Sequence, residues 1–257
     1  MNPRRKVVVT GLGLVTSLGI TVEESWQKAL AGVSGVHRLT EPRSQKSPVQ
    51  AVGEVCASER QRIEEEFKED APLEGERKTR FALWAAKRAI EDADLFKARG
   101  SRDRYGVVLA SGLGINRLED IQMWVKDRAS FDVARFGQEY TQVQAESIIR
   151  NNSNRTAALV SSKFGLTGVN CTVTSACASG TQAAGIGFRA VQRGDADLVL
   201  DSRGAGGEPA LQAKVEEERP AAVVPRDAEG DLVPLLEREL RCKILAEAVG
   251  LLVGVWR

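Results

Sequence analysis

A chain of 257 residues with 42% hydrophobic residues is long enough to bury the core of one large domain or two small ones. Its 36 Lys and Arg residues nearly balance its 35 Asp and Glu residues, which argues against an overall field that attracts nucleic acid or an anionic membrane. No apolar run approaches the roughly 20 residues of a membrane-spanning helix. We therefore expect a soluble globular protein that binds neither nucleic acid nor membrane.

The four cysteines, Cys56, Cys171, Cys177 and Cys242, form no Cys-x-x-Cys pair and have no histidine nearby. This pattern predicts neither a zinc site nor a dense disulfide framework, so we expect reduced thiols and no metal. The start of the chain passes from a basic pair directly into a strand-like run, without the apolar region of a secretory signal. We expect a cytoplasmic location, or the matrix of a plastid or mitochondrion, rather than secretion.

The first predicted element is a buried strand over Lys6–Thr10, closed by a loop at Gly11 and Gly13. A helix should follow, because Thr21 and Glu24 have the spacing of a capping box. Neither this glycine pair nor a later one is followed by the third glycine of a dinucleotide fingerprint. We therefore expect no nucleotide cofactor.

The middle of the chain alternates between helical and strand-like patterns. The charged stretch Glu59–Lys78 is typical of a solvated surface excursion. Helical spacing and β-branched runs then predict further elements in chain order: a helix over 80–93, a strand over 105–110, a helix over 153–164, a strand after the turn at Gly165 and Gly168, a helix over 180–192 and a strand over 196–200. This alternation favours a layered α/β domain.

The stretch Val173–Gln182, VTSACASGTQ, places Cys177 in the first turn of the helix that follows a strand. Unpaired backbone N–H groups and the positive end of the helix dipole favour a thiolate there. The small neighbouring residues leave room for a substrate carbonyl and for backbone donors to a developing oxyanion. The alternative is a buried structural cysteine, the commoner role for such a residue. His37, the one histidine, is interpreted as a surface or loop residue.

Three segments in this order resemble the β-ketoacyl-acyl-carrier-protein synthases, condensing enzymes of the thiolase superfamily. They read VVVTGLGLVTSLG, RKTRFALWAAKRAIEDADL and FGLTGVNCTVTSACASGTQAAGIGFRAVQRGDADLVL. The most specific motif is Ala-Cys-Ala-Ser-Gly around Cys177, followed by Gly194–Asp197. The resemblance implies an α/β fold, a thiolase-like layered sandwich of two similar halves, of which this chain holds only the N-terminal one.

The resemblance also implies an acyltransferase of fatty acid biosynthesis. Cys177 would accept an acyl group from acyl carrier protein as a thioester, and its own N–H would form half of the oxyanion hole. Malonyl-carrier protein would then lose carbon dioxide, and the resulting carbanion would attack the thioester. The family's two catalytic histidines, in a His-Gly-Thr-Gly-Thr loop and a Gly-His segment, have no counterpart here. We therefore expect condensation to be absent or very weak.

The resemblance divides the chain into three parts. Residues 1–200 form the half that carries the nucleophile, 201–232 diverge from the family pattern, and 233–257 resemble a remnant of its later strand and hairpin region. This division predicts a truncated synthase. Two alternatives remain: a non-catalytic half that forms a homodimer or associates with an intact synthase, and a fragment of a polyketide ketosynthase. Arg77, Lys78 and Arg80 are candidate contacts for the acidic carrier protein, although simple solvated charge explains them equally well.

Overall fold

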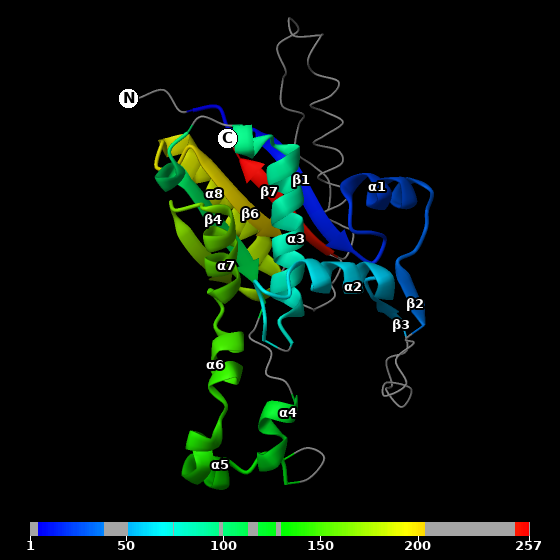
Figure 1. Ribbon diagram of the computed structural model, residues 1–257, viewed down its shortest axis with the longest axis vertical. Coiled ribbons are helices and arrows are strands. Elements are labelled where there is room, and N and C mark those ends of the chain that lie inside the picture. The colour runs from blue at the N-terminus through cyan, green and yellow to red at the C-terminus, as the bar shows by residue number, and fades with distance from the viewer. Residues whose placement is uncertain are drawn as a thin grey trace, which may run out of the picture.

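The computed structural model describes residues 5–38, 51–73, 75–97, 100–112, 118–126, 130–203 and 250–256. Its main sheet has five strands in the order β1-β7-β6-β4-β5 (Figure 1). Strand β4 runs parallel to β5 and β6, whereas β7 runs antiparallel to both β1 and β6. The strands span Val9–Thr16 (β1), Tyr105–Ser111 (β4), Asn170–Thr174 (β5), Leu198–Arg203 (β6) and Gly250–Trp256 (β7).

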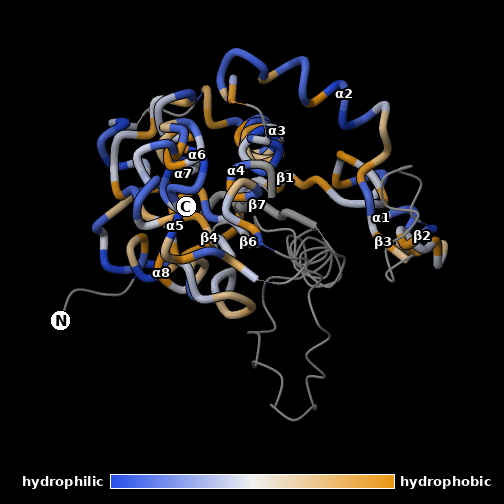
Figure 2. The backbone as a smooth tube through the Cα atoms, turned by 90° about the horizontal axis from the view of Figure 1, so that it is seen from below, coloured by the Kyte–Doolittle hydropathy of each residue, from blue (hydrophilic) through white to orange (hydrophobic). Residues whose placement is uncertain are grey.

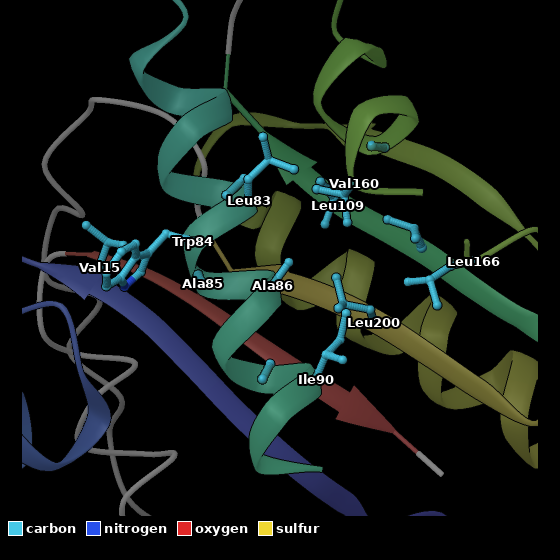
Figure 3. Packing of buried hydrophobic residues seen from close by; sticks show 14 of the residues in the cluster. Val15, Leu83, Trp84, Ala85, Ala86, Ile90, Leu109, Val160, Leu166 and Leu200 are labelled. Atoms are coloured by element: carbon cyan, nitrogen blue, oxygen red, sulfur yellow. The ribbon is translucent and has the colours of Figure 1, made fainter. Parts of the chain in front are cut away.

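Helices cover both faces of this sheet. Helices α2 (Ala57–Glu66), α3 (Arg77–Asp92) and α7 (Arg155–Phe164) lie on one face, and α8 (Ser179–Arg193) lies on the other (Figure 1). Alternate residues of β4 separate accordingly, because successive side chains of a strand point to opposite faces. Val107 and Leu109 join the larger core under α3 and α7, where Figure 3 shows Leu109 near Val160. Val108 and Ala110 pack in the smaller core against α8.

Most of the predicted regular elements are confirmed. The helices predicted over 80–93, 153–164 and 180–192 correspond to α3, α7 and α8, and the strands over 105–110 and 196–200 correspond to β4 and β6. The result is the layered α/β arrangement expected from the sequence. Strand β6 continues to Arg203, past the predicted boundary at residue 200, and residues 204–249 lie outside the described part of the chain.

The prediction for the first strand is wrong in its bounds. The strand begins at Val9 and runs through Gly11 and Gly13 to Thr16, instead of ending before these glycines. The reason is the close approach of α3: a Cβ added at Gly11 would overlap the carbonyl oxygen of Ala89, and one at Gly13 would overlap that of Ala85. The two glycines therefore mark a contact between backbones rather than a loop.

The interpretation of Glu59–Lys78 as a solvated excursion is also wrong in part. Most of α2 lies within this stretch, and its Ile63 is fully buried. Phe67, one turn later, is 2% exposed and belongs to the same core as Ile63. The charged residues between them occupy the outer face of an amphipathic segment.

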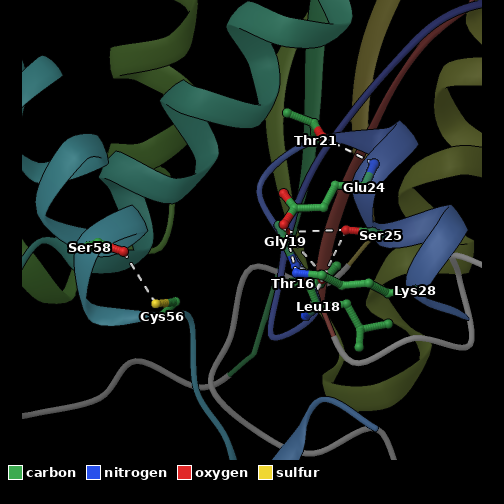
Figure 4. A network of polar contacts seen from close by, with 9 residues as sticks. All are labelled: Thr16, Leu18, Gly19, Thr21, Glu24, Ser25, Lys28, Cys56 and Ser58. Carbon is green, nitrogen blue, oxygen red and sulfur yellow. Dashed lines mark hydrogen bonds and ion pairs between the residues drawn. The ribbon is translucent and has the colours of Figure 1, made fainter. Parts of the chain in front are cut away.

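Helix α1 (Val22–Leu30) confirms the predicted cap, because the Thr21 hydroxyl accepts a hydrogen bond from Glu24 N at 3.3 Å (Figure 4). The turn that leads into α1 is held by a second hydroxyl. Thr16 Oγ1 accepts hydrogen bonds from Leu18 N at 3.0 Å and from Gly19 N at 3.2 Å. These bonds satisfy backbone donors that would otherwise have no partner between strand and helix.

A group of short helices extends from the sheet domain below α7 (Figure 1). It contains α4 (Leu118–Ile121), α5 (Val133–Glu139) and α6 (Ala145–Asn151). Its Trp124 ring packs edge-on against Phe136, with 5.0 Å between ring centroids, so this group of short helices has a small aromatic cluster of its own.

Two further strands, β2 (Val36–Arg38) and β3 (Ala51–Gly53), form a separate antiparallel pair. Among the described helices, none has the length and apolar character needed to cross a membrane.

Candidate active site

Cys177 lies in a 3₁₀ turn, Ala176–Ala178, that joins β5 to α8. The thiol therefore directly precedes the helix, one residue before its N-cap Ala178, rather than lying in the first helical turn. Cys177 is exposed and makes no disulfide. The alternative of a buried structural cysteine is thus wrong for this residue.

The residue directly before the thiol, Ala176, has an unusual backbone conformation. Ala176 has φ = 49°, one of two non-glycine residues with positive φ in the described chain. Side chains with a Cβ disfavour this left-handed region for steric reasons. The turn is closed by a hydrogen bond from Ala178 N to Ser175 O at 3.2 Å. The chain thus reverses sharply at Ala176, and the next residue is the exposed Cys177.

Two serine hydroxyls brace this turn, and the sequence alone did not identify either. Ser179 Oγ donates to Ala176 O at 2.7 Å. Ser175 Oγ donates to Gln182 Oε1 at 2.6 Å, linking the turn to the first turn of α8. The sequence does contain a signal for Ser179: a hydroxyl residue at the start of a helix often hydrogen-bonds to a nearby backbone group.

The N-terminus of α8 can stabilise negative charge. Its N-cap residue is an alanine, which gives the first N–H groups no side-chain acceptor. The positive end of the 15-residue helix therefore faces the segment that holds Cys177. An exposed thiol beside such a helix end can attack an electrophilic carbonyl, and nearby backbone N–H groups can stabilise the oxyanion that forms.

The structure does not bring His37 to this thiol. His37 lies in β2, and its Nε2 is 3.2 Å from Glu54 Oε2. Both Figure 1 and Figure 2 show β2 on the opposite side of the molecule from α8. His37 is exposed, as expected, but it belongs to a short strand rather than a loop.

The other described cysteines lie outside the site. Burial raises the pKa of the Cys171 thiol, a residue of β5. The exposed Cys56 precedes α2, and hydrogen bonds from Ser58 lower the pKa of its thiol (Figure 4). Within the described ranges, no group of His, Cys, Asp and Glu residues has the arrangement of a metal site. Cys242 lies outside the described residues.

The candidate carrier-protein contacts lie at the start of α3. Arg77 Nε is 3.5 Å from Glu64 Oε1, so its charge is partly matched within the chain. Arg80 donates to Ala71 O at 2.6 Å. Lys78 lies between them and is half-buried. Arg80 is thus directed toward its own chain, and of the three only Arg77 is exposed.

Comparison with known proteins gives consistent matches. The family model described as the N-terminal domain of β-ketoacyl synthase matches residues 4–208. The 3-oxoacyl-[acyl-carrier-protein] synthase 2 of Staphylococcus aureus (strain COL) is 29% identical over 201 residues, covering 78% of this chain and 45% of that protein. Its counterpart in Synechocystis sp. is 31% identical over 199 residues, covering 77% of this chain and 44% of that protein. The chain therefore spans about half the length of the curated relatives it matches.

Solved structures show the same fold. A type II polyketide ketosynthase, AntDE, in complex with its acyl-carrier protein AntF, matches with a TM-score of 0.62 at 20% identity. That match covers 100% of this chain and 58% of the other. A β-ketoacyl synthase from Burkholderia phymatum matches with a TM-score of 0.57 at 20% identity, covering 99% of this chain and 59% of that one. The thiolase-like layered fold expected from the sequence is confirmed.

Proposed function

This chain belongs to the β-ketoacyl synthase family, and we propose that it is the part of such a synthase that accepts the acyl group, with Cys177 as the acylated residue. The observation that supports this assignment most directly is the exposed Cys177 thiol in the turn that precedes the N-terminus of α8. The family-model match includes this turn. Of the two other described thiols, Cys171 is partly buried. Cys56 is exposed at the N-cap of α2, but it does not lie in a turn between a strand of the main sheet and a helix.

The proposed reaction is a thioester exchange. Cys177 Sγ, as thiolate, attacks the carbonyl carbon of an acyl thioester, and the carbon–sulfur bond to the donor breaks. The acyl group passes to Sγ, and the donor leaves as a thiolate that takes a proton from water. The N–H groups at the start of α8 would stabilise the tetrahedral oxyanion.

The proposed donor is an acyl group on acyl carrier protein. This rests on the names of the relatives, which are 3-oxoacyl-[acyl-carrier-protein] synthases, and on the structural neighbour that was solved with its carrier protein. We place the chain in fatty acid biosynthesis because of these relatives. A comparison of saturated acyl donors with polyketide-type β-keto donors separates this role from that of a polyketide ketosynthase.

The test is acylation of the purified chain by acyl-carrier protein, followed by peptide mass spectrometry. We expect an acyl adduct on the Cys177 peptide and none on the Cys56 peptide of the same molecules. Cys177→Ala should abolish the adduct while leaving the circular dichroism spectrum unchanged, because the side chain is exposed. A folded wild-type chain that gains no adduct, or gains it equally at Cys56, contradicts the proposal.

A further inference from the structure

We propose that Ser179 is a positioning residue for Cys177: its hydroxyl holds the Ala176 carbonyl and so maintains the left-handed turn that presents the thiol. The inference rests on the proposed acyl-accepting role of Cys177. It assigns to Ser179 a role through the backbone rather than contact with a substrate. Three features carry it: the backbone conformation of Ala176, the burial of Ser179 and the hydrogen bond between them.

The left-handed conformation of Ala176 needs an external restraint. At φ = 49° its Cβ is crowded against the backbone, and an unrestrained alanine returns to negative φ. Such conformations persist only where surrounding interactions fix them. If Ala176 returned to negative φ, the peptide that joins it to Cys177 would rotate. Both the thiol and the N–H of Cys177 would then move away from the N-terminus of α8.

Ser179 is suited to be that restraint because its own position is fixed. It is 3% exposed and is the first residue of α8. Helix α8 is anchored on the sheet by the buried residues Ala183 and Ala190. Its hydroxyl donates to Ala176 O at 2.7 Å, the same oxygen that accepts from the Ser179 backbone N–H, so the hydroxyl adds a second bond to the carbonyl of the strained residue itself. The Ser175–Gln182 bond is exposed and joins only side chains, so it restrains the Ala176 peptide far less directly.

The experiment measures how fast iodoacetamide alkylates Cys177 in the full chain, resolved by peptide mass spectrometry. The exposed Cys56 thiol in the same molecules is the internal control. Ser179→Ala should lower the Cys177 rate relative to the Cys56 rate by about tenfold, since small misplacements of a reacting group carry large rate penalties. Ser179→Thr, which keeps a hydroxyl, should recover most of the rate, and Ser175→Ala should have little effect.

A double-mutant cycle separates positioning from simple support of the helix. Glycine adopts φ = 49° without the steric penalty of alanine. In an Ala176→Gly background, Ser179→Ala should therefore lower the Cys177 rate much less than it does in the wild type. Equal losses in both backgrounds would mean that Ser179 merely stabilises α8, and would overturn the inference.

If Ser179→Ala does not fold, Ala176→Val tests the same turn with Ser179 intact. Valine opposes the left-handed region more strongly than alanine, so the Cys177 rate should fall while the Cys56 rate stays constant. An unchanged Cys177 rate in either variant overturns the inference. Failure of the proposed function looks different: the wild-type thiol would be alkylated normally yet would accept no acyl group from acyl-carrier protein.

Discussion

Asp197 joins three segments that are distant in the sequence. Its carboxylate accepts hydrogen bonds from Arg104 Nε at 2.7 Å and from Arg5 Nη1 at 2.8 Å. Arg104 also donates to Gly194 O at 2.6 Å, in the turn between α8 and β6. These two guanidinium groups lower the pKa of Asp197 to about 2, with the Arg104 bond as the larger cause. One carboxylate thus ties the N-terminal segment and the start of β4 to the turn after α8.

The charge of Asp197 should stabilise the fold at neutral pH. Because the folded-state pKa is depressed, the contribution is present above the unfolded pKa near 4 and is lost as the pH falls toward about 2. We expect Asp197→Asn to cost about 1 kcal/mol at pH 7, less than the full pKa shift implies, since both partners are partly exposed. Urea denaturation at pH 7 and pH 3 measures this. A difference between the two proteins that does not shrink at pH 3 contradicts the assignment.

Some residues of the candidate site could be identified from the sequence, and others could not. Cys177 was identifiable because a thiol among small residues between a strand and a helix is a local pattern. Ser179 was not identified, since its role depends on the φ angle of Ala176, and alanine carries no sequence signal for positive φ. The separation of His37 from the site likewise depends on the arrangement of whole elements.

The contact between β1 and α3 gives a prediction at the scale of elements. A Cβ at Gly13 would overlap Ala85 O and lie 2.7 Å from Ala89 N, both in the backbone of α3. Gly13→Ala must therefore push helix and strand apart, and we expect it to lower the free energy of unfolding by about 1–3 kcal/mol.

Gly137 in α5 provides the matched control for this substitution. A Cβ there meets no atom within 4 Å, so Gly137→Ala should be neutral or stabilise by roughly 0.5–1 kcal/mol through helix propensity. Urea titration of both variants gives the comparison. Equal stability of Gly13→Ala and the wild type would show that the two backbones are not in contact.

Helix α2 illustrates why composition misleads for some elements. The stretch that contains most of it is dominated by charge, yet Ile63 and Phe67, four residues apart, are both in the core. Their spacing is the signal of an amphipathic helix with a narrow apolar face. Helix α3 was easier to predict, because its apolar stripe is broad and includes Trp84, Ala85 and Ala89. The width of the apolar face, rather than the amount of charge, separates the two cases.

At the scale of the whole molecule, local patterns predicted the alternation of helices and strands but not the order of the sheet. Strand β7, from the end of the chain, pairs antiparallel with both β1 and β6. Val9 lies opposite Trp256 in one pairing, and Leu200 lies opposite Val255 in the other. These contacts join residues far apart in the sequence, for which periodicity carries no information. The parallel pairing of β4 with β5 and β6 follows more readily, since helices connect these strands.

Acyl transfer and condensation place different chemical demands on a protein. Acyl transfer to Cys177 needs an accessible thiol and backbone donors to the oxyanion, which the turn before α8 can provide. Decarboxylation and carbon–carbon bond formation need further groups to handle a proton and a developing negative charge. The single histidine of this chain, His37, lies across the molecule from α8 and pairs with Glu54.

We therefore expect the 257-residue chain, on its own, to become acylated without condensing. Supplied with acyl-carrier protein and malonyl-carrier protein, it should form 3-oxoacyl product about 10²–10⁴-fold more slowly than a complete 3-oxoacyl-[acyl-carrier-protein] synthase assayed in parallel, because acid/base groups contribute factors of that size. Mass spectrometry of the Cys177 peptide and of the carrier-bound product measures both steps in one reaction. Condensation at the rate of the complete synthase would mean that residues of this chain other than histidine handle the proton and the charge.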